Sequence, residues 1–328
     1  MPDNPLMIIV TGANGFIGSA FVWELNQAGI TDIICVDTVN LSNRNLLQKR
    51  TYSQFFEAQE LWSFLATPEA KKSVTWIVHM GACSSTTETN WDYLFANNFQ
   101  YSQRLFEWCS QNQKSLIYAS SAATYGAGEN GFNDSLDSEK LKPLNLYGES
   151  KVIMDRWVAK QKATPPNWYG LKFFNVFGPN EYEKGSMASV AFKAYHQILK
   201  TNELGLFKSY NANYKDGEQL RDFVYVKDIT RWIRELIQKK PQSGIYNMGF
   251  GEARSWLDMA RALFAAMGKP LQINWLEMPD SIRNQYQYFT KADMTKWSSQ
   301  NLSAPEWSLE KAITDYVQNH LSQKDPWL

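Results

Sequence analysis

Three glycines, Gly12, Gly15 and Gly18, follow the first apolar run of the chain, which covers residues 6–10. The residues after this turn, 16–27, have the apolar periodicity of an amphipathic helix. In a strand–turn–helix unit with this spacing, the first glycine permits a tight turn, the second lets the backbone approach a pyrophosphate, and the third permits close packing of helix and strand. The helix N-terminus would face the pyrophosphate charge. The pattern predicts a dinucleotide site, although a tight turn without a ligand can have the same glycines.

Two residues beyond the glycine turn bear on which dinucleotide would bind. Asp37 ends a second apolar run, residues 33–36, about 20 residues after the last glycine, where a carboxylate can bind the ribose hydroxyls of NAD. Arg44 lies further along and could bind the 2′-phosphate of NADP. The two signals conflict, and Asp37 could instead cap the next turn.

Apolar, strand-like runs recur along the first half of the chain and alternate with helical patterns. The runs cover residues 6–10, 33–36, 76–78, 116–118 and 169–174, and a less regular one lies at 51–58. Strands that alternate with helices form parallel sheets with helices on both faces. We therefore expect an α/β fold with a doubly wound, Rossmann-like parallel sheet.

The pattern changes after Gly178 and Pro179. From there we expect a helix, two short strands, and a helix–strand unit that returns to the main sheet, at residues 187–200, 205–207, 221–226, 228–239 and 244–248. A smaller α/β lobe would then be discontinuous in sequence. We expect a dinucleotide-binding domain of residues 1–174 and 225–248, and a substrate-binding domain of residues 175–224 and 249–328.

The charge balance and the cysteines limit the classes of partner and site. The 328 residues include 33 basic and 33 acidic side chains without a block of like charge, so neither nucleic acid nor an anionic membrane surface is favoured. No apolar run approaches the roughly 18 residues of a membrane span, and the N-terminal segment lacks a basic leader. Cys35, Cys83 and Cys109 lie far apart, which suits reduced thiols. Reduced thiols indicate a cytoplasmic protein. Cys and His lack metal-ligand spacing, so we expect no metal site.

Tyr147 and Lys151 are separated by one helical turn in a segment that follows Pro143 and is predicted to be helical. Both side chains would then point into one cleft. A nearby ammonium, joined by a cationic nicotinamide, would lower the pKa of the phenol from about 10 toward neutral pH and make it an acid/base group. An exposed helix pair without a catalytic role would have the same spacing.

Ser121 lies where the strand at 116–118 runs into a loop of small residues. Ligands of doubly wound folds bind beyond the carboxyl ends of the strands, so a hydroxyl at this place can bind a substrate oxygen. A turn serine without a ligand is the alternative.

Together, the glycine turn, Ser121 and the pair Tyr147 and Lys151 resemble the extended short-chain dehydrogenase/reductase family over nearly the whole chain. Five segments closely resemble the ADP-L-glycero-D-manno-heptose 6-epimerase family within it, namely residues 81–88, 118–126, 174–179, 185–192 and 221–226. The octapeptide 185–192 is the most diagnostic because it falls in the variable substrate lobe. The resemblance implies an enzyme that inverts C6″ of ADP-heptose by transient hydride transfer, on the route to the lipopolysaccharide inner core. A homo-oligomer is also expected.

The resemblance implies roles for individual residues. Tyr147 and Lys184 would be two acid/base groups, because the transient aldehyde must turn before the hydride returns to its opposite face, and its oxygen then meets a proton donor at a different place. Lys151 would orient the cofactor ribose and tune the phenol, and Ser121 would hold the reacting oxygen. Without the resemblance, Lys184 would be taken for a solvated loop lysine.

The cofactor implied by the family and by Arg44 is NADP, with NAD less favoured, and it should stay bound because oxidation and reduction cancel in each cycle. Met80 stands where family members often have Glu, which bears on this preference. The implied cofactor-binding residues are Gly12, Gly15, Phe16, Ile17, Gly18, Asp37, Thr38, Arg44, Met80, Gly81, Ala82, Cys83, Ser84, Asn97, Lys151, Val176 and Lys184.

The substrate implied is ADP-heptose or a related nucleotide sugar, and Arg221 would suit a bidentate contact with its phosphates. A surface arginine is the alternative. Lys193 stands where the family commonly has a substrate-contacting His, and the polar loop 210–219 is longer than usual. The implied substrate-binding residues are Asn175, Ser186, Lys193, Phe207, Lys208, Ser209, Tyr210, Arg221 and Tyr286.

Two other classes of function stay open at this point. Another extended-family enzyme would be a 4-epimerase, reductase or 4,6-dehydratase of a UDP-, GDP- or dTDP-hexose, and the dehydratase is disfavoured because Ala122 and Ala123 supply no acid beside the strand-end serine. A non-catalytic, NADP-binding scaffold would be expected to lack part of the set Ser121, Tyr147 and Lys151, and all three residues are present.

Overall fold

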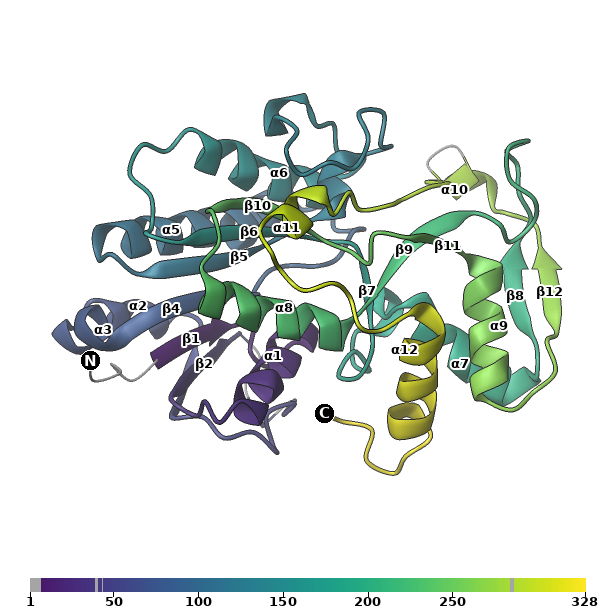
Figure 1. Ribbon diagram of the computed structural model, residues 1–328, viewed down its shortest axis with the longest axis horizontal. Helices are drawn as coiled ribbons and strands as arrows, with labels where there is room; N and C mark the ends of the chain where they lie inside the picture. The colour runs from purple at the N-terminus through teal and green to yellow at the C-terminus, as the bar shows by residue number, and fades with distance from the viewer. Residues whose placement is uncertain (1–6, 39–40, 43, 284–285) are drawn as a thin grey trace.

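The computed structural model describes residues 7–38, 41–42, 44–283 and 286–328. A seven-stranded parallel sheet lies at the centre of the larger unit, with the order β10-β6-β5-β4-β1-β2-β3 (Figure 1). The doubly wound, Rossmann-like fold is thereby confirmed. The strands are β1 (Met7–Thr11), β2 (Ile33–Asp37), β3 (Gln54–Glu57), β4 (Val74–His79), β5 (Ser115–Ser121), β6 (Trp168–Phe173) and β10 (Gly244–Met248). Leu6 and the N-terminal segment expected to lack a leader lie outside the described residues.

Helices cover both faces of this sheet because successive side chains of a strand point to opposite faces. In β1, Ile8 and Val10 belong to the core that α1 (Phe16–Gln27) and α8 (Val226–Lys239) complete. Ile9 belongs to the core on the other face. The helices that complete the second core are α2 (Leu61–Leu65), α3 (Pro68–Ser73), α5 (Tyr101–Gln111) and α6 (Leu146–Ala159).

The strand order reverses at β1, which lies between β2 and β4. The crevice above such a reversal, at the carboxyl ends of the strands, is where doubly wound folds bind ligands. A short helix, α4 (Trp91–Leu94), and a π-helical segment, Phe95–Gln100, connect this edge of β4 to α5. Single π-helical turns often occur beside functional sites.

The smaller lobe lies at one end of the larger unit, on the right of Figure 1. One of its sheets joins β7 (Asn175–Phe177), β9 (Leu220–Tyr225) and β11 (Ala253–Ser255), and the other pairs β8 (Leu204–Phe207) with β12 (Ile273–Leu276). The chain enters this lobe after β6, returns to the main sheet through α8 and β10, and enters the lobe again. Its helices are α7 (Val190–Thr201), α9 (Trp256–Ala266), α10 (Asp280–Arg283) and α12 (Leu309–Asp315).

Two helices differ from the sequence-based expectation, one in where it begins and one in not being expected. The helix expected from residue 187 begins at Val190, because Ser189 caps it with an Oγ that accepts a hydrogen bond from the Phe192 N–H at 3.1 Å. Helix α9 was not expected, although Ser255 and Asp258 form the capping box that marks its start.

The expected domain boundaries stay a prediction, and one packing contact bears on them. Helix α11 (Thr295–Ser299) lies within the range 249–328 that was expected to belong to the substrate lobe. Its Trp297 nevertheless packs against Trp232 of α8, with ring centroids 5.2 Å apart, in the core of the larger unit.

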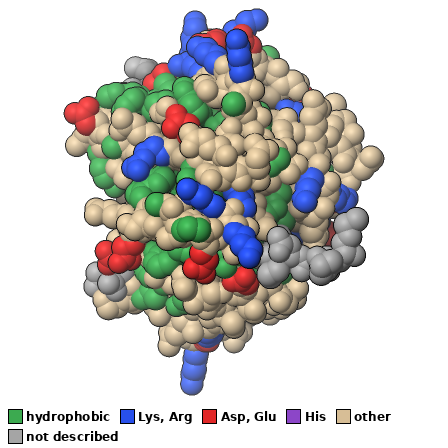
Figure 2. All heavy atoms as spheres, turned by 90° about the vertical axis from the view of Figure 1, so that its left-hand side faces the viewer, with side chains coloured by type: hydrophobic (Ala, Val, Ile, Leu, Met, Phe, Trp, Pro, Cys, Tyr) green, Lys and Arg blue, Asp and Glu red, His purple; other side chains and the backbone are tan. Residues whose placement is uncertain are grey.

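The surface and the thiols agree with an ordinary globular chain. Basic and acidic side chains are interspersed on the end of the molecule shown in Figure 2. Cys35, Cys83 and Cys109 are free thiols. Across the part of the chain that is described, no helix has the length and apolarity needed to cross a bilayer, and no cluster of three or more His, Cys, Asp or Glu could hold a metal ion.

Candidate active site

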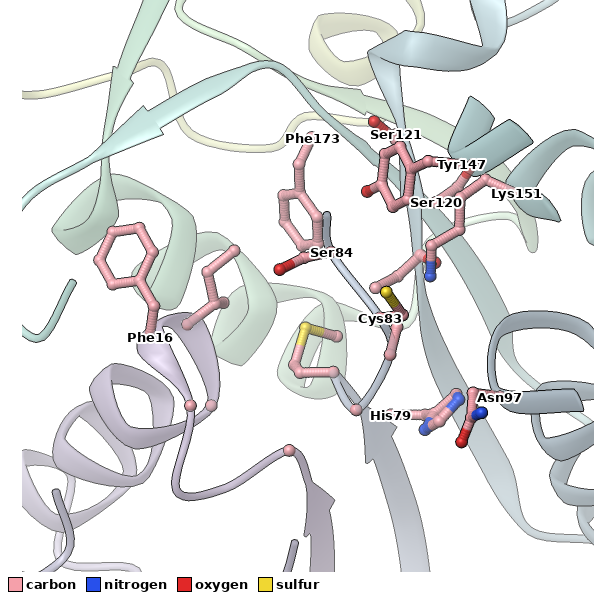
Figure 3. Close-up of a pocket in the computed structure, with 18 of the residues that line it drawn as sticks. Phe16, His79, Cys83, Ser84, Asn97, Ser120, Ser121, Tyr147, Lys151 and Phe173 are labelled. Atoms are coloured by element: carbon pink, nitrogen blue, oxygen red, sulfur yellow. The ribbon is translucent and has the colours of Figure 1, made fainter. Parts of the chain in front are cut away.

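A cavity of about 990 Å³ opens at the carboxyl edge of the main sheet. Figure 3 shows part of its lining, with Phe16 on one side, Tyr147 and Lys151 on the other, and Cys83 between them. The cavity therefore lies at the place that the strand reversal predicts. The strand ends that line it are Thr11, Asp37, His79, Ser121 and Phe173.

The glycine turn forms one wall of this cavity, and its backbone leaves no room for side chains. A Cβ on Gly12, where φ is +66°, would lie 2.5 Å from the Gly81 nitrogen, and a Cβ on Gly18 would lie 2.0 Å from the Gly12 oxygen. Within the described chain, no side chain caps the start of α1. The backbone N–H groups at this helix start therefore suit a pyrophosphate, as the sequence predicted.

Asp37 and Arg44 line the same cavity beside the glycine turn. The Asp37 Oδ2 accepts a hydrogen bond from the Asn14 N–H at 2.9 Å. The Arg44 Nε is buried and lacks a hydrogen-bond partner among the described residues, and it lies 3.7 Å from the Glu183 Oε2, which is too long for a hydrogen bond. A guanidinium with an unused buried donor fits an additional anionic group of a ligand.

Helix α6 carries Tyr147 and Lys151 into the cavity. The helix starts at this place because the Asn145 Oδ1 accepts a hydrogen bond from the Gly148 N–H at 2.8 Å. The Lys151 Nζ donates to the Ala119 carbonyl oxygen at 3.0 Å, and the Tyr147 hydroxyl shares a hydrogen bond with the Ser121 side chain. The residues expected to be catalytic on this side of the site are thus neighbours.

The electrostatics of the phenol differ from the sequence-based expectation. Burial raises the pKa of Tyr147, and Cys83 adds to this rise, although the hydrogen bond with Ser121 lowers the pKa in part. Burial also lowers the pKa of Lys151 to about 8, against the opposing effect of Asp155. Without a nicotinamide in the cavity, burial therefore outweighs the hydrogen bond that lowers the pKa of the phenol, and the lowering expected from Lys151 together with a cationic nicotinamide stays a prediction.

Lys184 lies in the loop that follows β7, and the structure brings it to the cavity. Its Nζ lies 5.3 Å from the centroid of the Phe16 ring, at the start of α1. Burial lowers the pKa of this lysine, and the nearby Glu181 raises it. The residue is therefore not the solvated loop lysine that its local sequence indicates.

Every residue expected to bind the cofactor, from Gly12 to Lys184, lines this one cavity. The residues expected to bind substrate are divided. Asn175 lines the cavity, and its Nδ2 donates to the Asp222 backbone carbonyl oxygen at 2.9 Å. The expected substrate residues that do not line it are Ser186, Lys193, Phe207, Lys208, Ser209, Tyr210, Arg221 and Tyr286.

These remaining residues form separate contacts in the smaller lobe. The Lys193 Nζ donates to the Ser186 oxygen at 3.3 Å. The Arg221 guanidinium lies 5.5 Å from the Trp256 ring and 5.4 Å from the Tyr286 ring, and it is buried. Arg221 is therefore not the surface arginine that sequence alone left open.

Sequence reasoning missed several residues of the lining. His79 was passed over, although a polar residue at the end of an apolar strand marks the edge where ligands bind. Its Nδ1 lies 2.6 Å from the Thr11 Oγ1 and its Nε2 lies 2.9 Å from the Ser102 Oγ. Other missed residues come from elements that no local motif singles out, namely Trp62, Tyr93, Tyr101, Gln287 and Thr290.

Comparison with known proteins assigns the chain to a family. The model of the NAD dependent epimerase/dehydratase family matches residues 8–249. The chain belongs to this family. Curated relatives named ADP-L-glycero-D-manno-heptose-6-epimerase share 46% identity in Fusobacterium nucleatum (98% of this chain, 100% of the relative) and 37% in Alkalilimnicola ehrlichii (95% and 96%). The resemblance stated from sequence is confirmed.

Solved structures of the epimerase/dehydratase family agree with this assignment. The crystal structure of Helicobacter pylori ADP-L-glycero-D-manno-heptose-6-epimerase has a TM-score of 0.77 at 25% identity and covers 97% of this chain and 98% of its own. The UDP-N-acetylglucosamine 4-epimerase of Methanobrevibacter ruminantium has a TM-score of 0.77 at 22% identity, covering 96% and 98%, and shows the shared fold. Fold similarity therefore extends across the family.

Proposed function

We propose that the chain is an NADP-dependent epimerase that inverts C6″ of ADP-D-glycero-β-D-manno-heptose to give the L-glycero epimer. Relatives with this name, at 46% and 43% identity, span nearly the whole chain and support the substrate. The observation that carries the proposal is that Tyr147 and Lys184 reach one cavity from different elements. Lys184 does so beside Phe16, which faces Tyr147 across the site in Figure 3.

The two groups suit an inversion because one proton donor cannot easily serve both orientations of the substrate. NADP, when bound in the cleft beside the glycine turn, would accept a hydride from C6″ and return it. Tyr147 would exchange a proton with the C6″ oxygen in one orientation, with Ser121 holding that oxygen. Lys184 would exchange the proton after the sugar end has turned. Lys151, whose Nζ donates to the Ala119 oxygen, would orient the cofactor ribose.

The preference for NADP over NAD rests on Arg44. The residues fit a dinucleotide, since the glycine turn packs so closely on neighbouring backbone that it has no room for a Cβ at Gly12 or Gly18, and the start of α1 lies open beside it. Beside it, the Arg44 Nε, which lacks a hydrogen-bond partner among the described residues, suits a 2′-phosphate, for which NAD has no counterpart. Met80, where the family often has Glu, lines the same cavity without contributing a carboxylate. We further propose a cytoplasmic homo-oligomer that supplies the heptose of the lipopolysaccharide core.

The test is to purify the chain and incubate it with ADP-D-glycero-β-D-manno-heptose without added cofactor. We expect NADP to copurify and NMR to show conversion to an equilibrium mixture of the two C6″ epimers. UDP-glucose, GDP-mannose and dTDP-glucose serve as the competing substrates. Conversion of one of these hexoses without C6″ inversion of ADP-heptose would replace the proposed substrate by the alternative, an extended-family enzyme of a nucleotide hexose.

A further inference from the structure

A lysine lies near the carboxyl end of a buried strand of the main sheet, behind the proposed active site. Lys172 of β6 is 1% exposed, and its Nζ donates to the Asp155 Oδ2 at 2.7 Å and to the Thr124 Oγ1 at 2.6 Å. Asp155 of α6 is fully buried. Buried ammonium and carboxylate groups cost free energy unless they are paired and hydrogen-bonded, so this pair needs a compensating network or a function.

The Asp155 carboxylate is held on every side by donors from the main sheet. Besides Lys172, it accepts hydrogen bonds from the Tyr118 hydroxyl at 3.0 Å and from the Ser120 hydroxyl at 2.8 Å, both on β5. Strand β5 ends at Ser121, which lines the cavity. The carboxylate therefore ties α6 to two strands just below the proposed catalytic groups.

Asp155 also stands in line with the catalytic face of α6. Tyr147, Lys151 and Asp155 follow one another at a spacing of one helical turn, so all three lie on the same face of the helix. Tyr147 and Lys151 reach the cavity, and Asp155 lies behind them against β5 and β6. The negative charge thus sits next to the Lys151 ammonium, on the side away from the cavity.

We propose that the buried pair of Asp155 and Lys172 is a positioning device for Lys151, because it fixes α6 against β5 and keeps a negative charge beside the Lys151 ammonium. The inference rests on the proposed function, in which Lys151 orients the cofactor. Burial lowers the pKa of Lys151 to about 8, and Asp155 raises it, so the carboxylate works to keep this lysine charged near neutral pH.

Other groups face Lys151 from the elements packed around it. Cys83, from the loop after β4, raises the pKa of this lysine. His79, at the end of β4, is kept neutral because burial and Lys151 lower its pKa to about 3. Tyr147 belongs to the same helix face. Among the groups that raise the pKa of Lys151, Asp155 has the largest effect and is the one anchored to the sheet.

The experiment compares three variants, Asp155→Asn, Lys172→Met and the double variant, with the full-length chain in saturating NADP. The pKa of Lys151 is measured by NMR of protein labelled at the lysine ε-carbon, with Lys151→Met used to assign the signal. Since a neighbouring opposite charge is worth roughly 1–3 pKa units, Asp155→Asn should lower the midpoint by about one unit or more. The alkaline limb of kcat/KM for epimerisation should move to lower pH by a similar amount.

Lys172→Met is the matched variant that breaks the same pair but keeps the carboxylate. It should lower the thermal midpoint without lowering the pKa of Lys151. If Asp155→Asn fails to fold because Lys172 is left without its counter-charge, the double variant removes both charges and should still lower the pKa of Lys151. Asp315→Asn, which breaks the 2.6 Å ion pair between α12 and Lys227 of α8, serves as the remote control and should leave the Lys151 midpoint unchanged.

Two results would overturn the proposal. One is an unchanged Lys151 midpoint in both Asp155→Asn and the double variant, and the other is an equal decrease in Lys172→Met. The unchanged midpoint would mean that the pair stabilises the fold without acting on the lysine. The equal decrease would mean that the midpoint responds to any disturbance of the pair and not to the Asp155 charge. Failure of the proposed function is distinguishable, since wild-type chain that does not epimerise ADP-heptose would still give the NMR titration.

Discussion

The Arg44 guanidinium lies 3.7 Å from the Glu183 carboxylate, and this contact joins the segment after β2 to the loop that carries Lys184. The cofactor end and the second acid/base end of the site are therefore linked through side chains far apart in sequence. Because the Nε of Arg44 has no hydrogen-bond partner in the described chain, a 2′-phosphate and Glu183 would share this guanidinium. The relation leads to a prediction on cofactor selection.

Arg44→Ser should weaken NADP binding by about 10- to 100-fold, since a hydrogen bond to a charged group is worth about 1.5–3 kcal/mol. Binding of NAD should change little. Glu183→Gln, the matched partner variant, should strengthen NADP binding because the competing carboxylate is gone. Calorimetric titration of cofactor-free protein with each dinucleotide measures all three effects, and an equal loss of NAD and NADP binding in Arg44→Ser would contradict the assigned role.

Tyr147→Phe should lower the rate of epimerisation by about 10²- to 10⁴-fold, the usual contribution of a positioned acid/base group. The cofactor should stay bound, because only the hydroxyl is removed from the cavity. Tyr195→Phe is the control, since it removes a hydroxyl that donates to the Leu321 oxygen in the smaller lobe. The checks are NMR assays of C6″ inversion and the absorbance of copurified NADP, and wild-type turnover in Tyr147→Phe would exclude the phenol from the reaction.

Glu181 clamps both ends of the loop that carries Lys184. Its carboxylate accepts hydrogen bonds from the Gly178 N–H at 3.1 Å, the Ser189 N–H at 2.6 Å and the Tyr316 hydroxyl at 3.0 Å. In Glu181→Gln the side-chain amide would face one of these donors, at a cost of about 1–3 kcal/mol in unfolding free energy.

We therefore expect Glu181→Gln to lower both the thermal midpoint and kcat, because the Lys184 loop loses its anchor. Tyr316→Phe removes one donor but leaves the loop ends attached. This variant should therefore lose about 1 kcal/mol of unfolding free energy and keep its kcat. Differential scanning calorimetry and the epimerisation assay provide the two readouts. A normal kcat in a destabilised Glu181→Gln protein would separate this clamp from the position of Lys184.

Asp222 predicts a pH dependence of stability. It is fully buried, and burial raises its pKa from 3.8 to about 6, although the N–H groups of Phe250, Gly251 and Ala292 lower it in part. Because the folded pKa lies above the unfolded one, this group's contribution to stability is fully present below pH 3.8 and is lost as the pH rises through about 6.

The loss from Asp222 between pH 4 and 7 should be about 2–3 kcal/mol, at 1.36 kcal/mol per pKa unit. Asp222→Asn should remove this slope while lowering stability overall, because its amide would face backbone donors. Urea unfolding of both proteins from pH 4 to 7 gives the difference curve. A flat difference over this range would show that the carboxyl titrates in the same way in both states.

Much of the larger unit follows from local sequence. Apolar runs that alternate with helical patterns predicted the strand positions. The spacing of Gly12, Gly15 and Gly18 predicted the turn from which α1 begins. The expected helices and strands end at residue 248, so α9 and α12 were missed, because short amphipathic helices with polar flanks resemble loops until their apolar faces have a core to pack on.

The sequence by itself determined the glycine cradle and the helical pair of Tyr147 and Lys151, because these depend on backbone geometry and side-chain spacing within a few residues. Only the tertiary structure decided that Lys184 reaches Phe16 and that Asp155 pairs with Lys172. These contacts join segments distant in sequence. Whether the two side chains of each contact meet depends on the order of the parallel strands and on which face of each helix packs on the sheet. No short window of sequence contains that information, since the same loop lysine or strand lysine would have a different neighbour in another sheet order.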